Sequence, residues 1–439
     1  MSGRFDTCPR FTVIIPAKDR ADYLAHTLRT CTMQRYDPLE IIVSDDGSTD
    51  STRAVVEEAS RRDPRIRLIA HDRPIGMRDN FEFALQEAKP GFVIMLGSDD
   101  GLLPDGITGM RDVLRDTGAE LLAWPAPVYI YPGARGTNGL LQIYHRKRTR
   151  LVESSTFLER QSRNLHYLSD LESPMLYVKG VASTRLIDQV RGRSPDQRFY
   201  ACATPDGYSG IVLAGEVERY AFSGRPFSLH GLSPSSQGLA YLSNAPEAKK
   251  ASAAFYKSAA AVPLHRELSS LPYSPLISVM TADYLLRARD LKGWPGRFPQ
   301  IDYRRMLTKS IAELSHGLYD SGRICRELAI LNRIADQHGL GQFFRETVRR
   351  ARRRPPKAPF TGSGIGPEAF YLDAAAFHIR DIFDAAYAAR NYYEIIANGS
   401  LESILAAFSN SVKYRLASLG RGAPFPQETE WITADPTAV

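Results

Sequence analysis

Two pairs of adjacent aspartates stand directly after apolar segments in the first quarter of the sequence. Asp45 and Asp46 follow "LEIIVS", and Asp99 and Asp100 follow "FVIMLGS". Adjacent carboxylates raise each other's pKa unless a cation or hydrogen-bond donors compensate their charge. Mg²⁺ and Mn²⁺ prefer such hard oxygen ligands, and either ion can bridge carboxylates to phosphate oxygens. We therefore expect Asp99 and Asp100 to bind a divalent cation together with a phosphorylated ligand.

Both pairs also fit a simpler interpretation. The sequence "DGSTD" is typical of a turn followed by a helix that is capped by Ser48 or Thr49. Asp99 and Asp100 precede "GLLPDG", which favours a turn as well. A turn needs only one acid of each pair, so ligand binding is the favoured hypothesis and the turn stays open.

A phosphate-binding glycine loop is absent from the sequence. There is no GxxxxGK[ST] motif, and the first apolar segment runs into "PAKDR" where a dinucleotide fold has GxGxxG. The later "GSGIG", Gly362 to Gly366, follows a proline-rich segment and is interpreted as a linker. A nucleotide bound here needs another partner for its diphosphate, and a divalent cation is the one that the acids favour.

The acidic pairs belong to a predicted α/β domain with helices on both faces of its sheet. Short, near-continuous apolar segments predict buried and mostly parallel strands at 11–16, 39–44, 66–70, 92–96 and 119–124. Crossover helices are predicted at 21–33, 49–61, 80–87 and 105–116. In such sheets the ligand lies beyond the carboxyl ends of the strands, where this sequence places its acids, amides and arginines.

Three motifs, "FTVIIPAKDRADYL", "EIIVSDDGSTDST" and "MLGSDDGLLPDGI", occur in this order between Phe11 and Ile107. Together they resemble the family 2 inverting glycosyltransferases of GT-A fold, of the type that builds bacterial surface polysaccharides. The resemblance implies an α/β GT-A domain with a Rossmann-like, mostly parallel sheet. It fades after Trp124 and says nothing about the α-helical C-terminal region that the sequence pattern predicts.

The resemblance implies a metal-dependent, inverting transfer of a hexosyl or N-acetylhexosaminyl group. The donor would be a nucleoside diphosphate sugar, with a UDP-sugar favoured, and the acceptor a glycan or a lipid-linked glycan. A catalytically silent protein that binds nucleotide sugars is the alternative from another class. A nucleotidyltransferase ranks lower, because it needs a phosphate loop richer in glycine than "PAKDRAD".

The resemblance also assigns roles to single residues. Asp45 would accept a hydrogen bond from a uracil-type imide, and Asp99 and Asp100 would be the metal ligands, with Asp100 preferred as the direct one. The family pattern has an acid where Gly97 stands, so one carboxylate fewer is available. The other expected donor contacts are Pro16, Ala17, Asp19, Arg20, Asp46, Arg78, Asn80, Ser98, His230 and Ser235.

An inverting transfer needs a base for the acceptor hydroxyl. The segment "TPDGYSGIVLA" resembles the family stretch that supplies this group, which indicates Asp206. The same residues fit a helix start with Thr204 as the cap and Pro205 at the first position, and a capped carboxylate stays ionised. Both roles are compatible, and Glu216 is the reserve candidate.

The segment "RPFSLHGLSPSSQG", from Arg225 to Gly238, has the composition of a loop and resembles one that folds over the donor. His230 in this loop is a candidate metal ligand or diphosphate contact, although a lone histidine is more often structural. Ser233, Ser235 and Ser236 are candidate donors to phosphate.

The stretch from Pro125 to Arg150 is aromatic and basic, with "VYIYPG" and "IYHRKRTR". Aromatic rings stack on sugar faces, and basic side chains suit a phosphorylated or lipid-diphosphate acceptor. An edge hairpin that is made soluble by its charges has the same composition. Both interpretations stay open.

The predicted organisation is a GT-A domain at 1–244, with a nucleotide half at 1–124 and an acceptor half at 125–244. A helical region at 245–354, a linker at 355–367 and a second helical region at 368–439 follow. Apolar residues at helical spacing, from Leu307 to Leu318 and from Ile324 to Ala335, predict a helical hairpin. These regions would pack on the GT-A domain, form an oligomer interface or approach a membrane.

The composition is that of a soluble chain of 439 residues, 43% hydrophobic and 24% charged, with a net charge of +7. Much of the excess lies in "RETVRRARRRPPK", Arg345 to Lys357, which would contact an anionic membrane or form the solvated face of a helix. Aromatic residues do not interleave with these arginines, which argues against nucleic-acid binding. Four scattered cysteines indicate reduced thiols. The sequence shows no apolar leader and no apolar segment long enough to span a membrane, so we expect a cytoplasmic protein. Any membrane association would be peripheral.

Overall fold

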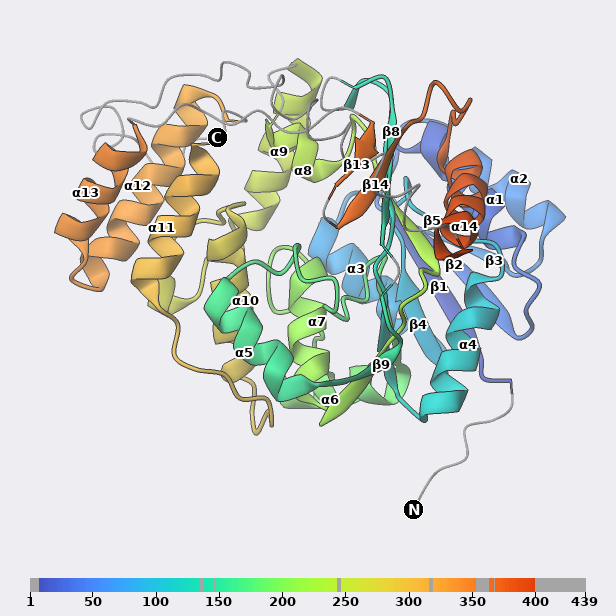
Figure 1. Cartoon of the computed structure of the whole chain (residues 1–439), viewed down its shortest axis with the longest axis horizontal. Coiled ribbons are helices and arrows are strands. Elements are labelled where there is room, and N and C mark those ends of the chain that lie inside the picture. Colours follow the sequence, from blue (N-terminus) through green and yellow to red (C-terminus); the bar gives the residue numbers. More distant parts are fainter. Residues whose placement is uncertain are drawn as a thin grey trace.

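The computed structural model describes residues 8–134, 137–145, 147–242, 246–315, 319–352, 363–366 and 368–398. Leu318, Lys357 and Gly362, which the sequence analysis named, lie outside these residues. Two sheets form the centre of the molecule, and a group of helices lies beside them (Figure 1).

The larger sheet begins as predicted. Its strands are β1 (Phe11–Ala17), β2 (Leu39–Asp45), β3 (Ile66–Ala70), β4 (Phe92–Met95), β6 (Leu121–Ala123), β9 (Arg150–Glu153), β10 (Gly180–Ser183) and β11 (Arg219–Phe222). They stand in the order β3-β2-β1-β4-β10-β6-β11-β9. β1 pairs in parallel with β2 and β4, and β2 with β3, which confirms the predicted α/β sheet. β10, which was not predicted, lies between β4 and β6 and runs antiparallel to both.

The helices have the following bounds. They are α1 (Ala21–Thr32), α2 (Thr52–Arg62), α3 (Met77–Gln86), α4 (Gly106–Thr117), α5 (Ser154–Asn164), α6 (Thr184–Arg193), α7 (Asp206–Gly215), α8 (Gln237–Leu242), α9 (Pro246–Ala259), α10 (Ile277–Arg289), α11 (Tyr303–Leu314), α12 (Ser321–Gln337), α13 (Gly341–Ala351) and α14 (Ile382–Asn398), with a 3₁₀ turn at Arg266–Leu268. α1, α2, α3 and α4 correspond to the four predicted crossover helices.

Helices cover both faces of the larger sheet because successive strand residues point to opposite sides. Val13 and Ile15 of β1 pack with Leu24 and Leu28 of α1 in one apolar cluster, which also includes residues of α2 and α4. Ile14, between them in sequence, belongs to the opposite cluster with residues of α3, α6 and α7. This second cluster continues into α10, α11, α12 and α13, so the helical region packs on the sheet through one shared core.

The smaller sheet is built from segments that lie far apart in the sequence. Its strands are β5 (Gly101–Leu102), β7 (Val128–Ile130), β8 (Leu140–Tyr144), β12 (Ser228–Leu232), β13 (Gly364–Ile365) and β14 (Ala369–Asp373). They stand in the order β13-β14-β8-β7-β12-β5. β7 and β8 form the predicted hairpin, but β12 and β14 flank it on both sides, so it is not at an edge.

The C-terminal segment returns to the N-terminal half of the chain. β14 pairs with β8, and α14 packs on the smaller sheet and on α1. Ile382, Ala385 and Ala386 of α14 are fully buried there. The "GSGIG" stretch was wrongly interpreted as a linker, because Gly364 and Ile365 pair with β14 as a strand. The region from residue 368 likewise starts with a strand before its helix.

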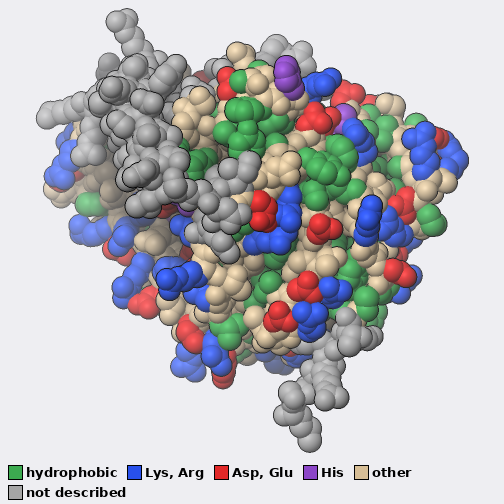
Figure 2. All heavy atoms as spheres, turned by 45° about the vertical axis from the view of Figure 1, so that its right-hand side comes forward, with side chains coloured by type: hydrophobic (Ala, Val, Ile, Leu, Met, Phe, Trp, Pro, Cys, Tyr) green, Lys and Arg blue, Asp and Glu red, His purple; other side chains and the backbone are tan. Residues whose placement is uncertain are grey.

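The predicted hairpin from Leu307 to Ala335 is present as α11 and α12. α13 buries Phe344 and Val348 and directs Arg350 to solvent, as the solvated-helix interpretation of the basic run expects. On the face seen in Figure 2, basic and acidic side chains are interspersed. In the part of the chain that the structure describes, no helix is both long and apolar enough to cross a bilayer.

Candidate active site

The acids after β2 are held by hydrogen bonds to their own neighbourhood. Asp45 is fully buried, accepts from the backbone N–H of Ser48 and forms an ion pair with Arg53, whose Nε lies 2.7 Å from its Oδ2. Asp46 accepts from the backbone N–H groups of Ile75 and Gly76, at 2.6 and 3.2 Å. Asp45 thus forms a local turn with Ser48, whereas Asp46 joins the loop after β2 to the loop before α3. α2 begins at Thr52 with Ser51 as its N-cap, so the predicted cap at Ser48 or Thr49 is wrong, and the nucleotide contact stays a prediction.

The loop after β1 lies against the loop after β2. Asp19, at a φ of 50°, accepts from the backbone N–H of Thr49 at 2.7 Å, and its own N–H donates to Ser48 Oγ at 2.8 Å. Arg20 donates to the backbone carbonyl of Ser235 at 2.5 Å. The predicted contacts Asp19, Arg20 and Ser235 thus lie together, and they join the donor-side loops to the loop that follows β12.

The acids after β4 use most of their oxygen atoms internally. Asp100 is fully buried; its Oδ1 accepts from the backbone N–H of Gly231 at 2.7 Å, and its Oδ2 accepts from that of Gly97 at 2.5 Å. Asp99 Oδ2 accepts from the hydroxyl groups of Ser233 and Ser236, at 2.7 and 2.6 Å. Burial and the adjacent Asp100 carboxylate raise the pKa of Asp99. The serines that were predicted to face phosphate therefore bind an aspartate instead.

The missing acid at position 97 has a steric reason. A Cβ atom on Gly97 would lie 2.3 Å from the hydroxyl oxygen of Tyr177 and 2.8 Å from Asp100 Oδ2. Tyr177 forms an isolated bridge with Met95 of β4, and its hydroxyl hydrogen-bonds to the Asp100 carboxylate. Burial together with that carboxylate raises the pKa of its phenol. The tyrosine hydroxyl thus occupies the space that an acid would need.

His230 of β12 forms an ion pair with the acids after β4. Its Nδ1 lies 3.0 Å from Asp100 Oδ1. Burial of the imidazole lowers its pKa, but the nearby carboxylates of Asp100, Asp99 and Asp206 outweigh this effect, so the pKa of His230 is raised. A protonated imidazole here would pair with a diphosphate.

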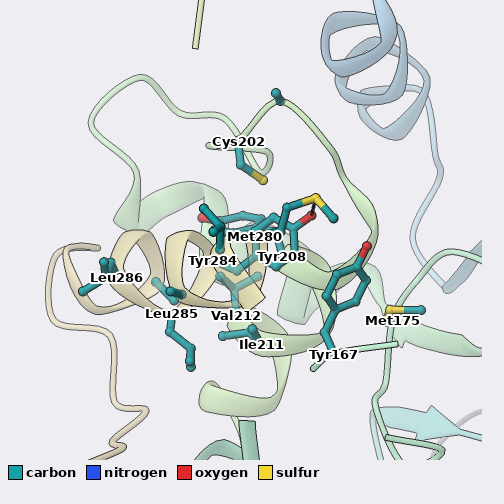
Figure 3. Packing of buried hydrophobic residues seen from close by; sticks show 14 of the residues in the cluster. Tyr167, Met175, Cys202, Tyr208, Ile211, Val212, Met280, Tyr284, Leu285 and Leu286 are labelled. Atoms are coloured by element: carbon teal, nitrogen blue, oxygen red, sulfur yellow. Dashed lines mark hydrogen bonds between the residues drawn. The ribbon is translucent and has the colours of Figure 1, made fainter. Parts of the chain in front are cut away.

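Asp206 is the first residue of α7, and its carboxylate lies near the same group. Burial raises the pKa of Asp206 to about 6, while His230 opposes the rise and Asp100 adds to it. α7 packs against α10 through Tyr208, Ile211 and Tyr284, so the end that carries Asp206 is held by a rigid core (Figure 3). Thr204 does not cap this helix; its hydroxyl pairs with Tyr284 at 2.6 Å. The cap interpretation of Thr204 is therefore wrong.

Glu216 lies at the other end of α7, away from Asp206. Arg193 donates from Nε and Nη2 to its two carboxylate oxygens, at 2.6 and 2.9 Å. A helix of this length spans about 15 Å, at roughly 1.5 Å per residue. Glu216 thus has a structural partner and lies far from the acids after β4.

The remaining predicted donor contacts have different surroundings. Asn80 is buried and donates from Nδ2 to the backbone carbonyl of Ser44 at 3.0 Å, which ties α3 to β2. Arg78 pairs with Asp79 at 2.9 Å, at the start of α3. Pro16 and Ala17 end β1, and the backbone carbonyl of Ser98 accepts from Thr27.

The structure does not bring Asp99, Asp100 and His230 together as a three-ligand metal site. Among the described residues, no group of three or more His, Cys, Asp or Glu side chains is arranged to hold a metal ion. The reason is that both Asp100 oxygens face backbone N–H groups and His230 Nδ1 faces Asp100. Asp99 Oδ1 accepts no hydrogen bond from the described residues, so it is the carboxylate oxygen left for a cation.

Several residues of the site were missed by sequence reasoning. Tyr177 lies in "PMLYVKG", and Arg53 lies in a predicted helix without any special spacing. Both become part of the site only through the packing of segments that are distant in sequence. The described cysteines have no disulfide partners, and burial raises the pKa of Cys31 to about 12, which agrees with inert thiols.

The mostly parallel sheet and the acids that follow β4 agree with the GT-A-like α/β fold that the resemblance implies. Residues 12–166 match the family model described as glycosyl transferase family 2, which confirms the resemblance that the three motifs carry.

Curated relatives agree with this family. The chain is 32% identical over 116 residues to the succinoglycan biosynthesis protein ExoO of Rhizobium meliloti, which covers 26% of this chain and 33% of that protein. It is 34% identical over 104 residues to the GalNAc(5)-diNAcBac-PP-undecaprenol beta-1,3-glucosyltransferase of Campylobacter jejuni, covering 23% and 33%. The chain thus spans about a third of the length of these relatives.

Solved structures with distant sequences were also found. TarS 1–349 of S. aureus in complex with UDP-GlcNAc has 14% identity and a TM-score of 0.44, with 83% of this chain and 99% of that chain covered. The mannosyltransferase PcManGT of Pyrobaculum calidifontis, in complex with GDP-Man and Mn²⁺, has 15% identity and a TM-score of 0.39, with 78% and 86% covered.

Proposed function

We propose that this protein is an inverting glycosyltransferase that moves a sugar from a nucleoside diphosphate sugar, with UDP-sugars favoured, to a hydroxyl of a glycan or lipid-linked acceptor. One observation carries the proposal. The Asp206 carboxylate lies at the start of α7, near Asp100 and His230, within reach of their charges. An inverting transfer is a single displacement, and it needs a base and a group that binds the diphosphate in the same site.

Asp206 acts as the base in this reaction. It removes the proton of the acceptor hydroxyl while the hydroxyl oxygen bonds to the anomeric carbon and the bond from that carbon to the diphosphate breaks. Its pKa of about 6 leaves most of the carboxyl ionised at neutral pH and keeps it basic enough to accept the proton. Protonated His230, whose pKa is raised, offers positive charge to the departing diphosphate.

The donor base and ribose lie at the ends of β1 and β2 in this proposal. Asp45, at the buried end of β2, is the expected partner of the uracil imide, and Arg53 holds its carboxylate in place. Asp19 and Arg20 shape the adjoining loop. Arg78 stays a candidate contact at the border of this region.

A divalent cation fits the site through Asp99 rather than through Asp100. Asp99 Oδ1 is free of hydrogen bonds from the described residues, whereas both Asp100 oxygens accept them. Mg²⁺ often uses one or two carboxylates together with substrate phosphates, and a cation bound in this way neutralises charge on the diphosphate. The preference for Asp100 as direct ligand is therefore replaced by Asp99.

The proposal is tested by product formation from a panel of UDP-sugars and acceptors with Asp206→Asn. We expect transfer to fall by about 10² or more, the usual contribution of a general base, while the affinity for UDP is retained. Asp188→Asn, at an exposed residue of α6, is the matched control and should keep full activity. UDP binding without any transfer by the unmodified protein would favour the silent nucleotide-sugar binder instead.

A further inference from the structure

A pocket of about 250 Å³ lies between α3, which belongs to the part of the chain that matches the family model, and α9, which lies beyond that part. The first turn of α3, with the loop before it, forms one wall. The end of α9 and the residues after it form the opposite wall, and Ala203 closes the side toward α7.

The shape of the pocket depends on Gly76, the residue before α3. Its φ is +94°, and a Cβ atom there would lie 2.6 Å from Ser258 Oγ of α9. Only glycine allows α9 to approach this loop so closely. Asp46 fixes the same loop through the Gly76 N–H, so the pocket wall is anchored to the end of β2.

The charge of the pocket favours an anion. Asp79, its acid, is paired with Arg78 at 2.9 Å and with Arg198 at 3.0 Å. Lys257 of α9 is exposed and forms no ion pair with any residue that the structure describes. The positive charge of Lys257 in the lining is thus not neutralised by a carboxylate of the described residues.

The same wall offers an aromatic ring. Phe255 lines the pocket and is half-buried, with its ring centroid 5.3 Å from that of Tyr273. A ring that is fixed on one side and open on the other can stack on the apolar face of a sugar. Ser258, beside it, supplies a hydroxyl for the sugar's polar edge.

The pocket lies beside the proposed base. Ala203 precedes Asp206 by one turn of chain, and Tyr273, which packs on Phe255, is close enough to Asp206 for its carboxylate to raise the pKa of the phenol. A ligand in the pocket would therefore lie beside the start of α7.

We propose that this pocket, formed by Phe255, Lys257 and Ser258 of α9 opposite the first turn of α3, binds a negatively charged pyranose of the acceptor. This inference rests on the proposed function, because it takes the pocket as the acceptor side of that reaction. The negative group is a carboxylate or a phosphate on the sugar, which Lys257 pairs with while the ring of Phe255 stacks on the pyranose.

The experiment measures binding of three probes to the full chain by ligand-observed NMR titration: methyl β-D-glucuronide, glucose 1-phosphate and methyl β-D-glucoside. We expect at least one charged probe to bind more tightly than the neutral glucoside. Lys257→Gln should weaken that probe by about fivefold, the upper range for an exposed ion pair, and leave the glucoside unchanged. Phe255→Leu should weaken all probes that bind. Lys292→Gln, at another exposed lysine, is the control and should change nothing.

Titration of UDP with Mn²⁺ on the same samples separates the two proposals. Charged probes that bind no better than the glucoside, or an unchanged affinity in Lys257→Gln, would overturn the pocket assignment even if UDP binds. The two charged probes distinguish a uronic acid from a sugar phosphate. Tight binding of a charged probe that depends on Lys257, without any UDP binding, would keep the pocket and refute the proposed function.

Discussion

At the scale of single residues, the site depends on carboxylates with different surroundings. Asp100 is buried among hydrogen-bond donors, Asp99 accepts from two serines through one oxygen only, and Asp206 stands at the start of a helix nearby. Environment rather than residue type thus separates an anchor, a candidate cation ligand and the proposed base.

The pH dependence of transfer should report Asp206. Because its pKa is raised to about 6 in the folded protein, the fraction in the basic form grows as pH rises through this value. We expect kcat/KM to increase from pH 5 and to level off above about pH 7, roughly one unit beyond this pKa. A rate profile in a nucleotide-release assay checks this, and a flat profile over the same range would contradict the assignment.

The raised pKa of Asp206 should also make the stability of the folded protein depend on pH. The folded protein binds its proton more tightly than the unfolded chain, where the pKa is near 3.8. Its contribution to the free energy of unfolding therefore falls as pH rises between 3.8 and about 6. Chemical denaturation at several pH values should show a weaker decline over this window in Asp206→Asn.

Gly97 and Tyr177 should behave as a coupled pair. Gly97→Ala places a methyl group against the Tyr177 hydroxyl, so we expect a loss of about 1–3 kcal/mol in the free energy of unfolding. In a Tyr177→Phe background the oxygen at 2.3 Å is absent and only the approach to Asp100 Oδ2 at 2.8 Å remains, so the same alanine should be less destabilising. Urea denaturation of the four proteins measures this double-mutant cycle. Equal losses in both backgrounds would show that the tyrosine is not what excludes a side chain at Gly97.

At the scale of elements, α7 joins the proposed base to the helical region. Its first residue is Asp206, its buried face packs on α10, and its last turn is fixed by the pair of Glu216 with Arg193. The helix therefore sets the position of the base relative to the sheet from both of its ends.

Arg193→Met should lower the free energy of unfolding but leave the catalytic residues in place. It leaves the buried Glu216 carboxylate unpaired, which costs about 3 kcal/mol, the lower end for a broken buried pair. Glu216→Gln should keep turnover per folded molecule, since Glu216 lies at the far end of α7. Thermal denaturation and a transfer assay on both variants check this, and a loss of turnover like that of Asp206→Asn would make Glu216 the base.

Sequence patterns predicted the first four strands and their helices because those segments are local and strongly apolar. They also placed Asp99, Asp100, His230 and Asp206 as candidates, and the structure brings these four close together. What they missed depends on long-range packing: Tyr177 reaches Gly97 from a loop before β10. The strand at Gly364 has the local composition of a linker, and only its pairing with β14 makes it a strand.

At the scale of the whole molecule, the C-terminal helix α14 packs against the segment that carries Asp99 and Asp100. Ile382 of α14 is fully buried, and its Cγ1 lies 3.1 Å from where a Cβ of Gly101 would be, directly after Asp100. His26 of α1 and Asp381 form an ion pair at 2.9 Å beside it. Residues from both ends of the described chain thus hold the same part of the site.

Ile382→Ala should therefore affect both stability and donor binding. We expect a loss of about 2–5 kcal/mol in the free energy of unfolding, as for other large-to-small core substitutions. Under conditions where the protein stays folded, its affinity for UDP should also fall, because Gly101 and Asp100 lose their support. Tyr387→Ala, at an exposed position of the same helix, should change neither quantity. Urea denaturation and UDP titration measure the two effects.

The pairing of β8 with β14, which is far away in the sequence, also has a consequence for folding during synthesis on the ribosome. Until residues 369–373 leave the exit tunnel, β8 has a free edge, although its other partner, β7, was made long before. An unpaired edge with apolar side chains invites pairing with other chains. The interval between synthesis of β8 and of β14 is thus the period when a nascent chain is most exposed to aggregation, and slower translation there should lower the yield of folded protein.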